Sequence, residues 1–429
     1  MKKQSVRRQA AILTCCNAFT RALGFVLRIV LSRLLGAEAV GVMELSHSAH
    51  MLSITPVTAG VPLAVSRMTA RDQNDRALRA GFQLILRLSL CIMPIWLLLS
   101  PVIAHLLNEM RVLPSLLFFT PCILILGLSA ICNGYSYGCG NAWPPAISEV
   151  VEQLLRFSLS AALLLSLPYL STAYRAAVPA LATTVAEGVG LLLTFFLLRL
   201  PMRTRRDLQS AQREILALSL PLMLSRLLTT LLRTASGALI PQRLIVSGLT
   251  SAQALEQFGM LQGMVMPVLF LPGIVTGALG TVGTPAIAAR SGKSQQRMAV
   301  GLFLSALICG TLGMTAVHAL SPFLAQKIYA LPHLTPLFRH AAPLTVLFSL
   351  QHAVNGVMSG LGEQKRLLLP ALLSSLLSLI LLYFWAAQPH TRILGAVRAM
   401  VWSQAASVMW GLLLVWRYEG KGTGKTVLS

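Results

Sequence analysis

Long apolar segments recur along the whole chain and are separated by short polar stretches. A membrane-spanning helix needs about 20 mainly apolar residues. The second and eighth segments are the longest, and carry Pro62 and Pro285 near their ends, where a kink is expected. The pattern predicts an all-α polytopic membrane protein with about twelve transmembrane helices. The segments cover residues 10–35, 39–66, 80–106, 113–138, 146–167, 176–199, 214–240, 257–288, 298–320, 338–360, 367–387 and 394–416.

The composition agrees with this prediction. Hydrophobic residues make up 55% of the 429 residues and charged residues 11%, whereas a soluble domain carries about 25% charged residues. The first apolar segment is too long for a signal-peptide core, so we expect a retained first span. The seven cysteines fall in or beside apolar segments. Their spacing suggests neither a zinc site nor a disulfide framework, and we expect no metal and no cofactor.

The net charge of +22 raises the question of nucleic-acid binding, but the basic residues cluster in short loops between the apolar segments. One set of loops and both termini contain 21 lysines and arginines, and the alternate loops contain 7. Cytoplasmic loops carry such an excess. We therefore expect no nucleic-acid partner and both termini in the cytoplasm.

Short motifs recur between the two halves of the chain. Residues 60–67 (GVPLAVSR) match 283–290 (GTPAIAAR), and 133–140 (NGYSYGCG) match 355–362 (NGVMSGLG). These matches predict two parallel six-helix repeats around a central cavity, an arrangement typical of transporters. We expect an N-terminal bundle at 1–200, a basic cytoplasmic linker at 201–213 and a C-terminal bundle at 214–429. The second N-G-x-x-x-G-x-G motif, like the first, is expected to permit close helix packing and a turn.

Seven basic residues remain at membrane depth, where a charge costs at least about 2.5 kcal/mol. Arg21 and Arg28 stand seven residues apart on one helix face, and Arg226 and Arg233 repeat this spacing. Arginine presents a planar set of donors suited to phosphate. The alternative is that these side chains extend to a membrane interface. The full set is Arg21, Arg28, Arg87, Arg156, Arg226, Arg233 and Arg398.

Carboxylates at membrane depth are the second group of candidates. Glu44 and His47 share a helix face and could relay a proton or Na⁺, or Glu44 could neutralise Arg28 or Arg33. Glu149, Glu152 and Arg156 share a face after Pro144-Pro145, where a helix is expected to begin, and either stabilise the helix start or line an inner gate. Glu187 could bind a cation or pair with Arg156.

Enzyme functions have little support. The three aspartates lie in predicted cytoplasmic loops, and no D-x-D pair is present for a metal and a sugar diphosphate. Two stretches resemble the end of a P-loop, but their first glycine positions hold Ile287 and Glu419. A membrane-bound glycosyl or acyl transferase remains an alternative of a different class.

Six stretches carry a resemblance to the stage V sporulation protein B family of polysaccharide-type flippases, which share a superfamily with multidrug/toxin extrusion antiporters and lipid II flippases. The resemblance covers about residues 5 to 416. It implies alternating-access transport of an undecaprenyl-diphosphate-linked saccharide, such as a peptidoglycan precursor. The stretches are GFVLRIVLSRLLGAEAVG (24–41), TAGVPLAVSRM (58–68), PPAISEVVEQLLR (144–156), LPLMLSRLLTTLLR (220–233), LIPQRLIVSGL (239–249) and LFLPGIVTGALG (269–280).

The chain departs from the family pattern in three places. Relatives commonly have fourteen spans, the Arg-Asp pair of lipid II flippases is absent from the first segment, and no basic residue lies between Leu244 and Ala289. We expect Arg21, Arg28, Arg156, Arg226 and Arg233 to bind the diphosphate. Glu44, His47, Glu149, Glu152 and Glu187 are the cavity or ion-coupling candidates. The expected partners are the lipid-linked substrate, membrane lipids and Na⁺ or H⁺; the alternative function is an ion-coupled organic-cation antiporter.

Overall fold

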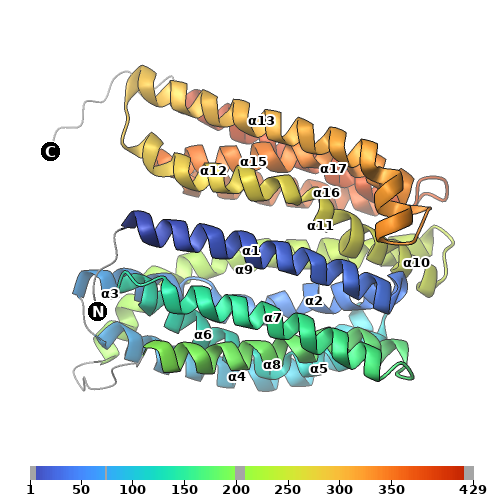
Figure 1. The fold of residues 1–429 in the computed structure, drawn as a ribbon, viewed down its shortest axis with the longest axis horizontal. Coiled ribbons are helices and arrows are strands. Elements are labelled where there is room, and N and C mark those ends of the chain that lie inside the picture. The colour runs from blue at the N-terminus through green and yellow to red at the C-terminus, as the bar shows by residue number, and fades with distance from the viewer. Residues whose placement is uncertain (1–5, 73–74, 199–207, 420–429) are drawn as a thin grey trace. The chain divides into compact units, whose positions relative to one another are not determined.

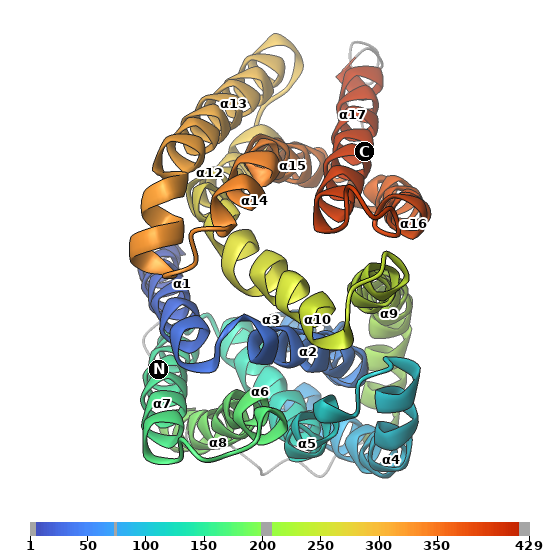
Figure 2. The ribbon, with the colours of Figure 1, turned by 90° about the vertical axis from the view of Figure 1, so that its right-hand side faces the viewer.

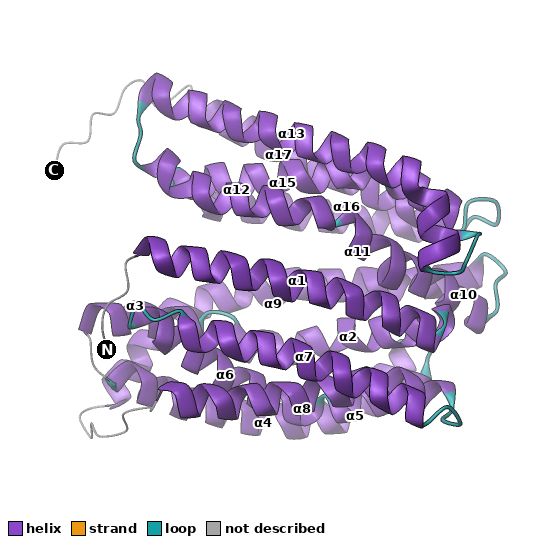
Figure 3. Cartoon of the chain, viewed as in Figure 1, coloured by secondary structure: helices purple, strands orange, loops and turns teal. Residues whose placement is uncertain are grey.

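The computed structural model describes residues 6–72, 75–198 and 208–419. These residues form helices joined by short loops, and no strand occurs among them, as Figure 3 shows. The all-α class predicted from the sequence is confirmed. Each of the twelve apolar segments contains at least one helix.

The chain divides into two compact units, Met1–Ala238 (unit 1) and Leu239–Ser429 (unit 2). The division falls inside α9 (Leu208–Val246). Thr234 of α9 donates a hydrogen bond to the backbone of Ser48 in unit 1, whereas Arg243 donates to the backbone of Tyr383 in unit 2. Residues 201–207 of the expected linker lie outside the described residues, and 208–213 already belong to α9.

In unit 1, α7 packs against α1 and α8, and α6 packs against α3, α4 and α8. These helices run along one direction in Figure 1. Their bounds are α1 (Val6–Leu35), α2 (Ala37–Thr58), α3 (Val61–Asp72), α4 (Arg76–Leu106), the 3₁₀ helix η1 (Met110–Val112), α5 (Leu113–Phe118), α6 (Thr120–Gly138), α7 (Trp143–Ser166) and α8 (Thr172–Leu198).

In unit 2, α15 packs against α12, α13 and α17, and α16 packs against α17. The buried core of this unit includes Ile287, Leu302 and Val354. The bounds are α10 (Ser251–Gly259), the π-helix η2 (Met260–Val265), α11 (Met266–Leu269), α12 (Leu271–Ala288), α13 (Gly292–Phe323), the π-helix η3 (Leu324–Ile328), α14 (Leu334–Ala341), α15 (Pro343–Gly360), the 3₁₀ helix η4 (Gln364–Leu367), α16 (Leu368–Trp385) and α17 (Ile393–Glu419).

Eight helical segments of the described chain are long and apolar enough to cross a membrane, and the bent pair Met110–Phe118 and Thr120–Gly138 makes nine. In the segment Arg76–Leu106 only 17% of the most apolar window is buried inside the protein. An apolar helix that exposes most of its side chains is typical of a lipid-facing span. The predicted count of twelve is not confirmed, because α1, α7 and α15 are not among the eight or nine.

The second and eighth predicted spans, for which a proline kink is expected, are both interrupted. The second changes from α2 to α3 at Gly60, whose φ of 94° favours glycine, two residues before Pro62. The eighth is interrupted at Phe270, between α11 and α12, and not at Pro285, through which α12 continues. A proline follows each break, but at the second it is Pro272 in the first turn of α12 and not the predicted Pro285.

The repeated N-G-x-x-x-G-x-G motif ends two helices in the same way. After α6, the N–H of Asn141 donates to the carbonyl of Ser136 at 2.9 Å, and Gly140 has a φ of 69°. After α15, Glu363 donates to Met358 at 2.9 Å, and Gly362 has a φ of 75°. Both ends are Schellman caps with glycine in the left-handed position. The turn predicted for both motifs is confirmed.

The two earlier glycines of each motif allow close helix packing. A Cβ on Gly138 would lie 2.6 Å from the carbonyl oxygen of Ser66 on α3. A Cβ on Gly360 would lie 2.8 Å from the carbonyl oxygen of Thr284 on α12. The motif thus packs α6 on α3 in unit 1 and α15 on α12 in unit 2, so its role is the same in each unit.

Candidate functional site

Most polar side chains predicted to be functional lie on four helices of unit 1. α7 packs between α1 and α8, and α2 contacts α1. In Figure 2, which views the helices nearly end-on, α2 lies between α1 and α9. The hydrogen bond from Thr234 of α9 to Ser48 of α2 agrees with this arrangement.

An ion pair joins α1 to α2. Nη1 of Arg28 donates to Oε1 of Glu44 at 2.8 Å, and the two side chains are 37% and 12% exposed. This pair is one of the two alternatives predicted for Glu44. His47, one turn farther along α2, has an exposed side chain close enough to Arg28, Glu44 and Arg156 to sense their charges. The side chain of His47 is therefore exposed and lies near charged side chains.

A second ion pair joins α7 to α8. Nη2 of Arg156 donates to Oε1 of Glu187 at 2.6 Å, with side-chain exposures of 23% and 11%. The pairing alternative predicted for Glu187 is therefore confirmed. At membrane depth each charge compensates the other, which lowers the cost of placing both there.

Glu152 is held by a hydroxyl and a close glycine. Oγ of Ser148 lies 2.7 Å from Oε1 of Glu152 and 2.8 Å from the carbonyl oxygen of Gly190. A hydroxyl has one hydrogen, so it donates to one of these acceptors at a time. A Cβ on Gly190 would overlap the Glu152 carboxyl group. Only glycine at position 190 leaves room for the carboxylate.

Glu149 connects α7 to α1. The buried hydroxyl of Thr20 donates to Oε1 of Glu149 at 3.2 Å. α7 begins at Trp143 with Pro144 and Pro145 in its first turn, as predicted. Glu149 is thus nearly two turns past the helix start and in contact with another helix, so it does more than stabilise that start.

These side chains form one group, which we call the unit 1 polar cluster. Arg156, Glu149 and Glu187 lie close enough to Glu152 for their charges to interact with its carboxyl group. Arg28 and Arg156 lie close enough to His47 to interact with its imidazole ring in the same way. Four carboxyl groups face two guanidinium groups. This part of the protein thus contains more carboxyl groups than guanidinium groups. Its members are Arg28, Glu44, His47, Glu149, Glu152, Arg156 and Glu187.

Arg21 lies outside these ion pairs. Its side chain is exposed, and it has no ion pair or hydrogen bond among the described residues. The Arg28–Glu44 contact sets the register of the antiparallel helices α1 and α2. Seven residues along each helix correspond to about 10 Å, so Arg21 lies at about the depth of Met51.

Arg233 reaches a similar depth on the other side of α2. Thr234 bonds to the backbone of Ser48 at 2.8 Å, and the hydroxyls of Thr230 and Thr55 are 3.3 Å apart. Arg233 is therefore opposite the stretch of α2 between Ser48 and Thr55, which includes Met51. Its side chain is exposed and has no ion pair in the described part of the chain.

Arg226 is the remaining predicted arginine. Its side chain is exposed on α9, about two turns before Arg233, and shows no ion pair within the described ranges. The convergence of all four arginines on one anion stays a prediction. Arg28 differs from the others because Glu44 already engages its guanidinium.

The sequence analysis missed three residues of unit 1. Ser148 is one helical turn before Glu152, a spacing that could have indicated it, whereas no sequence signal marks Gly190. His50 is buried, stacks on Phe119 with ring centroids 4.1 Å apart, and has no hydrogen-bond partner for Nε2 in the structure as described. His50 belongs to an aromatic core, not to the polar cluster.

Other polar residues hold helices of unit 2 together. The side-chain oxygen of Gln351 on α15 accepts from Gln404 at 3.4 Å and from Ser407 at 3.1 Å, both on α17. Such contacts between membrane helices are typical of uncharged polar groups. Among the described residues, no group of three or more His, Cys, Asp or Glu side chains is arranged to hold a metal ion.

Comparison with known families shows to which family the chain belongs. Residues 6–291 match the family described as polysaccharide biosynthesis protein, which covers well over half of the chain. The chain belongs to this family. It is 28% identical to stage V sporulation protein B of Bacillus subtilis (strain 168) over 94% of this chain and 82% of the relative. It is 25% identical to the lipid II flippase MurJ of the same organism over 37% of this chain and 32% of the relative.

Solved structures show the same fold. The chain resembles an inward-facing multidrug resistance MATE family transporter of the MOP superfamily, with a TM-score of 0.77 and 15% identity over 95% of this chain and 96% of the other. A MOP superfamily transporter from Pyrococcus furiosus Vc1 (DSM3638) gives a TM-score of 0.67 and 16% identity over 98% of each chain. The protein is a multi-pass membrane protein with a MOP-type transporter fold, and family and fold point to a transporter and not to an enzyme.

Proposed function

We propose that this protein is a flippase of the bacterial cytoplasmic membrane. Its substrate is an undecaprenyl-diphosphate-linked saccharide, such as a peptidoglycan or polysaccharide precursor, moved from the inner to the outer leaflet. Family membership and the likeness to a lipid II flippase support this class of substrate. Both termini are then cytoplasmic, in keeping with the basic loops of the sequence.

One observation carries the proposal. Arg21 and Arg233 are exposed at about the same depth on the two helices that flank α2, and neither has a carboxylate partner among the described residues. An uncompensated guanidinium at membrane depth is costly, and two of them at one depth on the helices that flank α2 favour a shared anion. A diphosphate supplies the missing negative charge and accepts paired hydrogen bonds from such groups. Arg226 lies on the same helix as Arg233, α9, about two turns earlier.

Transport follows an alternating-access cycle. In transporters of this kind, one bundle rocks against the other around a site near the membrane midplane. The arginines hold the diphosphate while the polyprenyl chain stays in lipid. Arg28 and Arg156 contribute through their partners Glu44 and Glu187, because these acids adjust how much positive charge remains for the substrate.

Reconstituted transport tests this proposal. Arg21→Ala, Arg226→Ala and Arg233→Ala should each reduce flipping of a polyprenyl-diphosphate saccharide in proteoliposomes at least about tenfold, the effect of roughly 1.4 kcal/mol. Arg87→Ala is the matched control, because Arg87 is also exposed at predicted membrane depth but lies on α4. Wild-type flipping in all three variants, with normal amounts of protein in the membrane, contradicts the assignment.

A second function, cation-coupled antiport of organic cations, is favoured by a different observation. The unit 1 polar cluster contains four carboxyl groups and two guanidinium groups. Ser148 can donate to ionised Glu152, or accept from protonated Glu152 while it donates to Gly190, so either protonation state is satisfied. A carboxyl group that is hydrogen-bonded both when protonated and when ionised can take up and release the H⁺ that drives antiport. The carboxylates of the same cluster could also bind Na⁺ as the coupling ion.

A binding assay separates the two functions. Purified protein in detergent is offered a polyprenyl-diphosphate saccharide and a hydrophobic organic cation. Preference for the diphosphate, lost in Arg21→Ala, supports the flippase. Preference for the cation, lost in Glu152→Gln or Glu187→Gln but kept in Arg21→Ala, supports the antiporter.

A further inference from the structure

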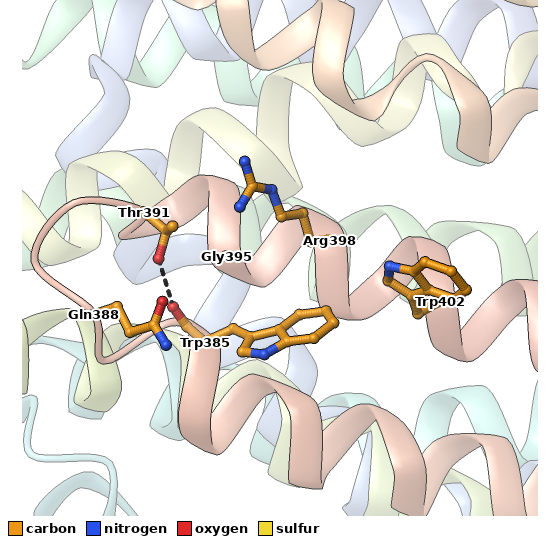
Figure 4. Close-up of a pocket in the computed structure, with 6 residues that line it drawn as sticks. All are labelled: Trp385, Gln388, Thr391, Gly395, Arg398 and Trp402. Carbon is orange, nitrogen blue, oxygen red and sulfur yellow. Dashed lines mark hydrogen bonds between the residues drawn. The ribbon is translucent and has the colours of Figure 1, made fainter.

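A pocket of about 360 Å³ lies in unit 2, where α16 ends and α17 begins. Figure 4 shows its side chains around the loop that joins the two helices. Both helices belong to segments long and apolar enough to span a membrane, so their connection lies at a membrane interface. The lining residues are Trp385, Gln388, Thr391, Gly395, Arg398 and Trp402.

The pocket is held open by contacts between the loop and the end of α16. The hydroxyl of Thr391 donates to the carbonyl oxygen of Trp385 at 2.9 Å, as Figure 4 shows. A Cβ on Gly395 would overlap the same carbonyl group. The floor of the pocket is therefore fixed by backbone contacts that do not involve Arg398 or Gln388, so these two side chains are available to a ligand.

Arg398 has no negative partner among the described residues. It is exposed, and neither an ion pair nor a hydrogen bond engages it in the described part of the chain. Between Glu363 and Glu419 the sequence contains no acidic residue. Glu363 is 22 residues before Trp385, and Glu419 is 21 residues after Arg398, which corresponds to about 30 Å along a helix. An anion from outside the protein can therefore compensate the charge of Arg398.

The surroundings indicate that this anion belongs to a lipid. Trp402 is 62% exposed beside the pocket, and tryptophan concentrates at membrane interfaces. A stripe of exposed apolar residues on α16 leads away from the pocket at a helical spacing that would suit an acyl chain. Its members are Leu369, Leu373, Leu376, Ile380 and Phe384.

We propose that this pocket binds the phosphate of an anionic membrane phospholipid. Arg398 holds the phosphodiester with paired hydrogen bonds, Gln388 donates to the headgroup, and an acyl chain follows the apolar stripe of α16. The site lies wholly in unit 2 and shares no residue with the arginines of α1 and α9. It is therefore independent of the proposed transport function.

Native mass spectrometry of the purified protein tests the site. Phosphatidylglycerol and phosphatidylcholine with the same acyl chains are titrated separately, and bound lipid is counted. We expect the wild type to prefer phosphatidylglycerol. Arg398→Gln should raise the Kd for phosphatidylglycerol about tenfold, which corresponds to a loss of roughly 1.4 kcal/mol of binding free energy. Arg398→Lys should keep part of the preference, because it keeps the charge but not the paired hydrogen bonds.

Arg417→Gln is the matched control, because Arg417 is an exposed arginine in the last turn of α17, far from the pocket. It should bind phosphatidylglycerol as the wild type does. Equal binding of phosphatidylglycerol by the wild type and by Arg398→Gln overturns the proposal. Displacement of the lipid by millimolar inorganic phosphate also overturns it, because the pocket would then be a site for free phosphate.

A stability measurement keeps the test decisive if lipid counting is dominated by non-specific lipid. Phosphatidylglycerol should raise the thermal unfolding temperature of the wild type and of Arg417→Gln, since a ligand that binds only the folded state stabilises it. Phosphatidylglycerol should raise the thermal unfolding temperature of Arg398→Gln by a smaller amount. The same increase in all three proteins contradicts a site at Arg398.

Discussion

Arg156 shows at the level of one residue how this protein accommodates charge at membrane depth. Its Nη2 donates to Glu187, while its Nε is buried without a hydrogen-bond partner among the described residues. The side chain is therefore engaged at one end only. Such a residue depends strongly on its carboxylate, and the carboxylate depends on it.

Removal of Arg156 should be more damaging than removal of an exposed arginine. Arg156→Ala leaves Glu187 buried without its partner, which typically costs about 3–5 kcal/mol. We expect a clear drop in the thermal unfolding temperature in detergent, largely restored in the double variant Arg156→Ala/Glu187→Ala. The control is Arg71→Ala, which breaks the exposed pair with Glu214, worth about 1 kcal/mol or less. Similar losses in both single variants contradict this account.

Gly190 is a second position where one added carbon atom should change both stability and transport. Gly190→Ala places a Cβ on the Glu152 carboxyl group, so that carboxyl must leave Ser148. We expect lower stability and loss of any transport that depends on a cation gradient, measured by thermal unfolding and in proteoliposomes. Gly188→Ala is matched, because its Cβ would meet only Cδ1 of Ile125 at an ordinary 3.8 Å. Equal behaviour of the two variants would count against a role for Glu152.

At the level of helices, the two N-G-x-x-x-G-x-G motifs show how a short sequence determines both packing and a helix end. The final glycine adopts a positive φ in the Schellman cap, and the preceding ones face a neighbouring helix closely. The same hydrogen bonds recur after α6 and after α15. Schellman caps with glycine are common at helix ends, so this agreement shows that the two motifs act alike, and the two-repeat layout stays a prediction.

The similar close contacts of the two motifs predict equal effects in the two units. Gly138→Ala and Gly360→Ala each push a Cβ to within 3 Å of a carbonyl oxygen, and overpacking of this kind costs about 1–3 kcal/mol. Gly301→Ala on α13 is the control, since nothing lies within 4 Å of its Cβ and alanine favours a helix. Thermal unfolding should show two similar losses and no loss in the control. A loss in one unit only would indicate that the motifs are not equivalent.

Sequence reasoning succeeded where a signal is local. Apolar length predicted the helices, Pro144-Pro145 predicted the start of α7, and the need to compensate charge at membrane depth suggested the partners of Arg28 and Arg156. It failed where the cause lies in another helix, because nothing near Gly190 in the sequence reveals the carboxylate that requires it. The break at Phe270 is different: Pro272 in the first turn of α12 is a local signal that the prediction did not use.

At the level of the whole molecule, family and fold agree on a multi-pass transporter, whereas the number of spans depends on three helices. α7 carries Glu149, Glu152 and Arg156, and α15 carries Gln351 and His352, so the functional and packing residues themselves lower the apolar character of these helices. A helix whose polar face is turned toward protein can still cross a membrane. The sequence prediction of twelve spans requires α1, α7 and α15 to do so.

Cysteine labelling in intact cells tests α7 and α15 directly. In a background without the seven native cysteines, Trp143→Cys and Ser171→Cys bracket α7, and His333→Cys and Gln364→Cys bracket α14 and α15; all four positions are exposed. If both helices cross, a membrane-impermeant maleimide labels positions 171 and 333 from outside, and labels 143 and 364 only after permeabilisation. Labelling of all four after permeabilisation is the control for access. Equal labelling on both sides of α7 or α15 in intact cells would show that this helix does not cross, and the positive-inside assignment of every later loop would then reverse.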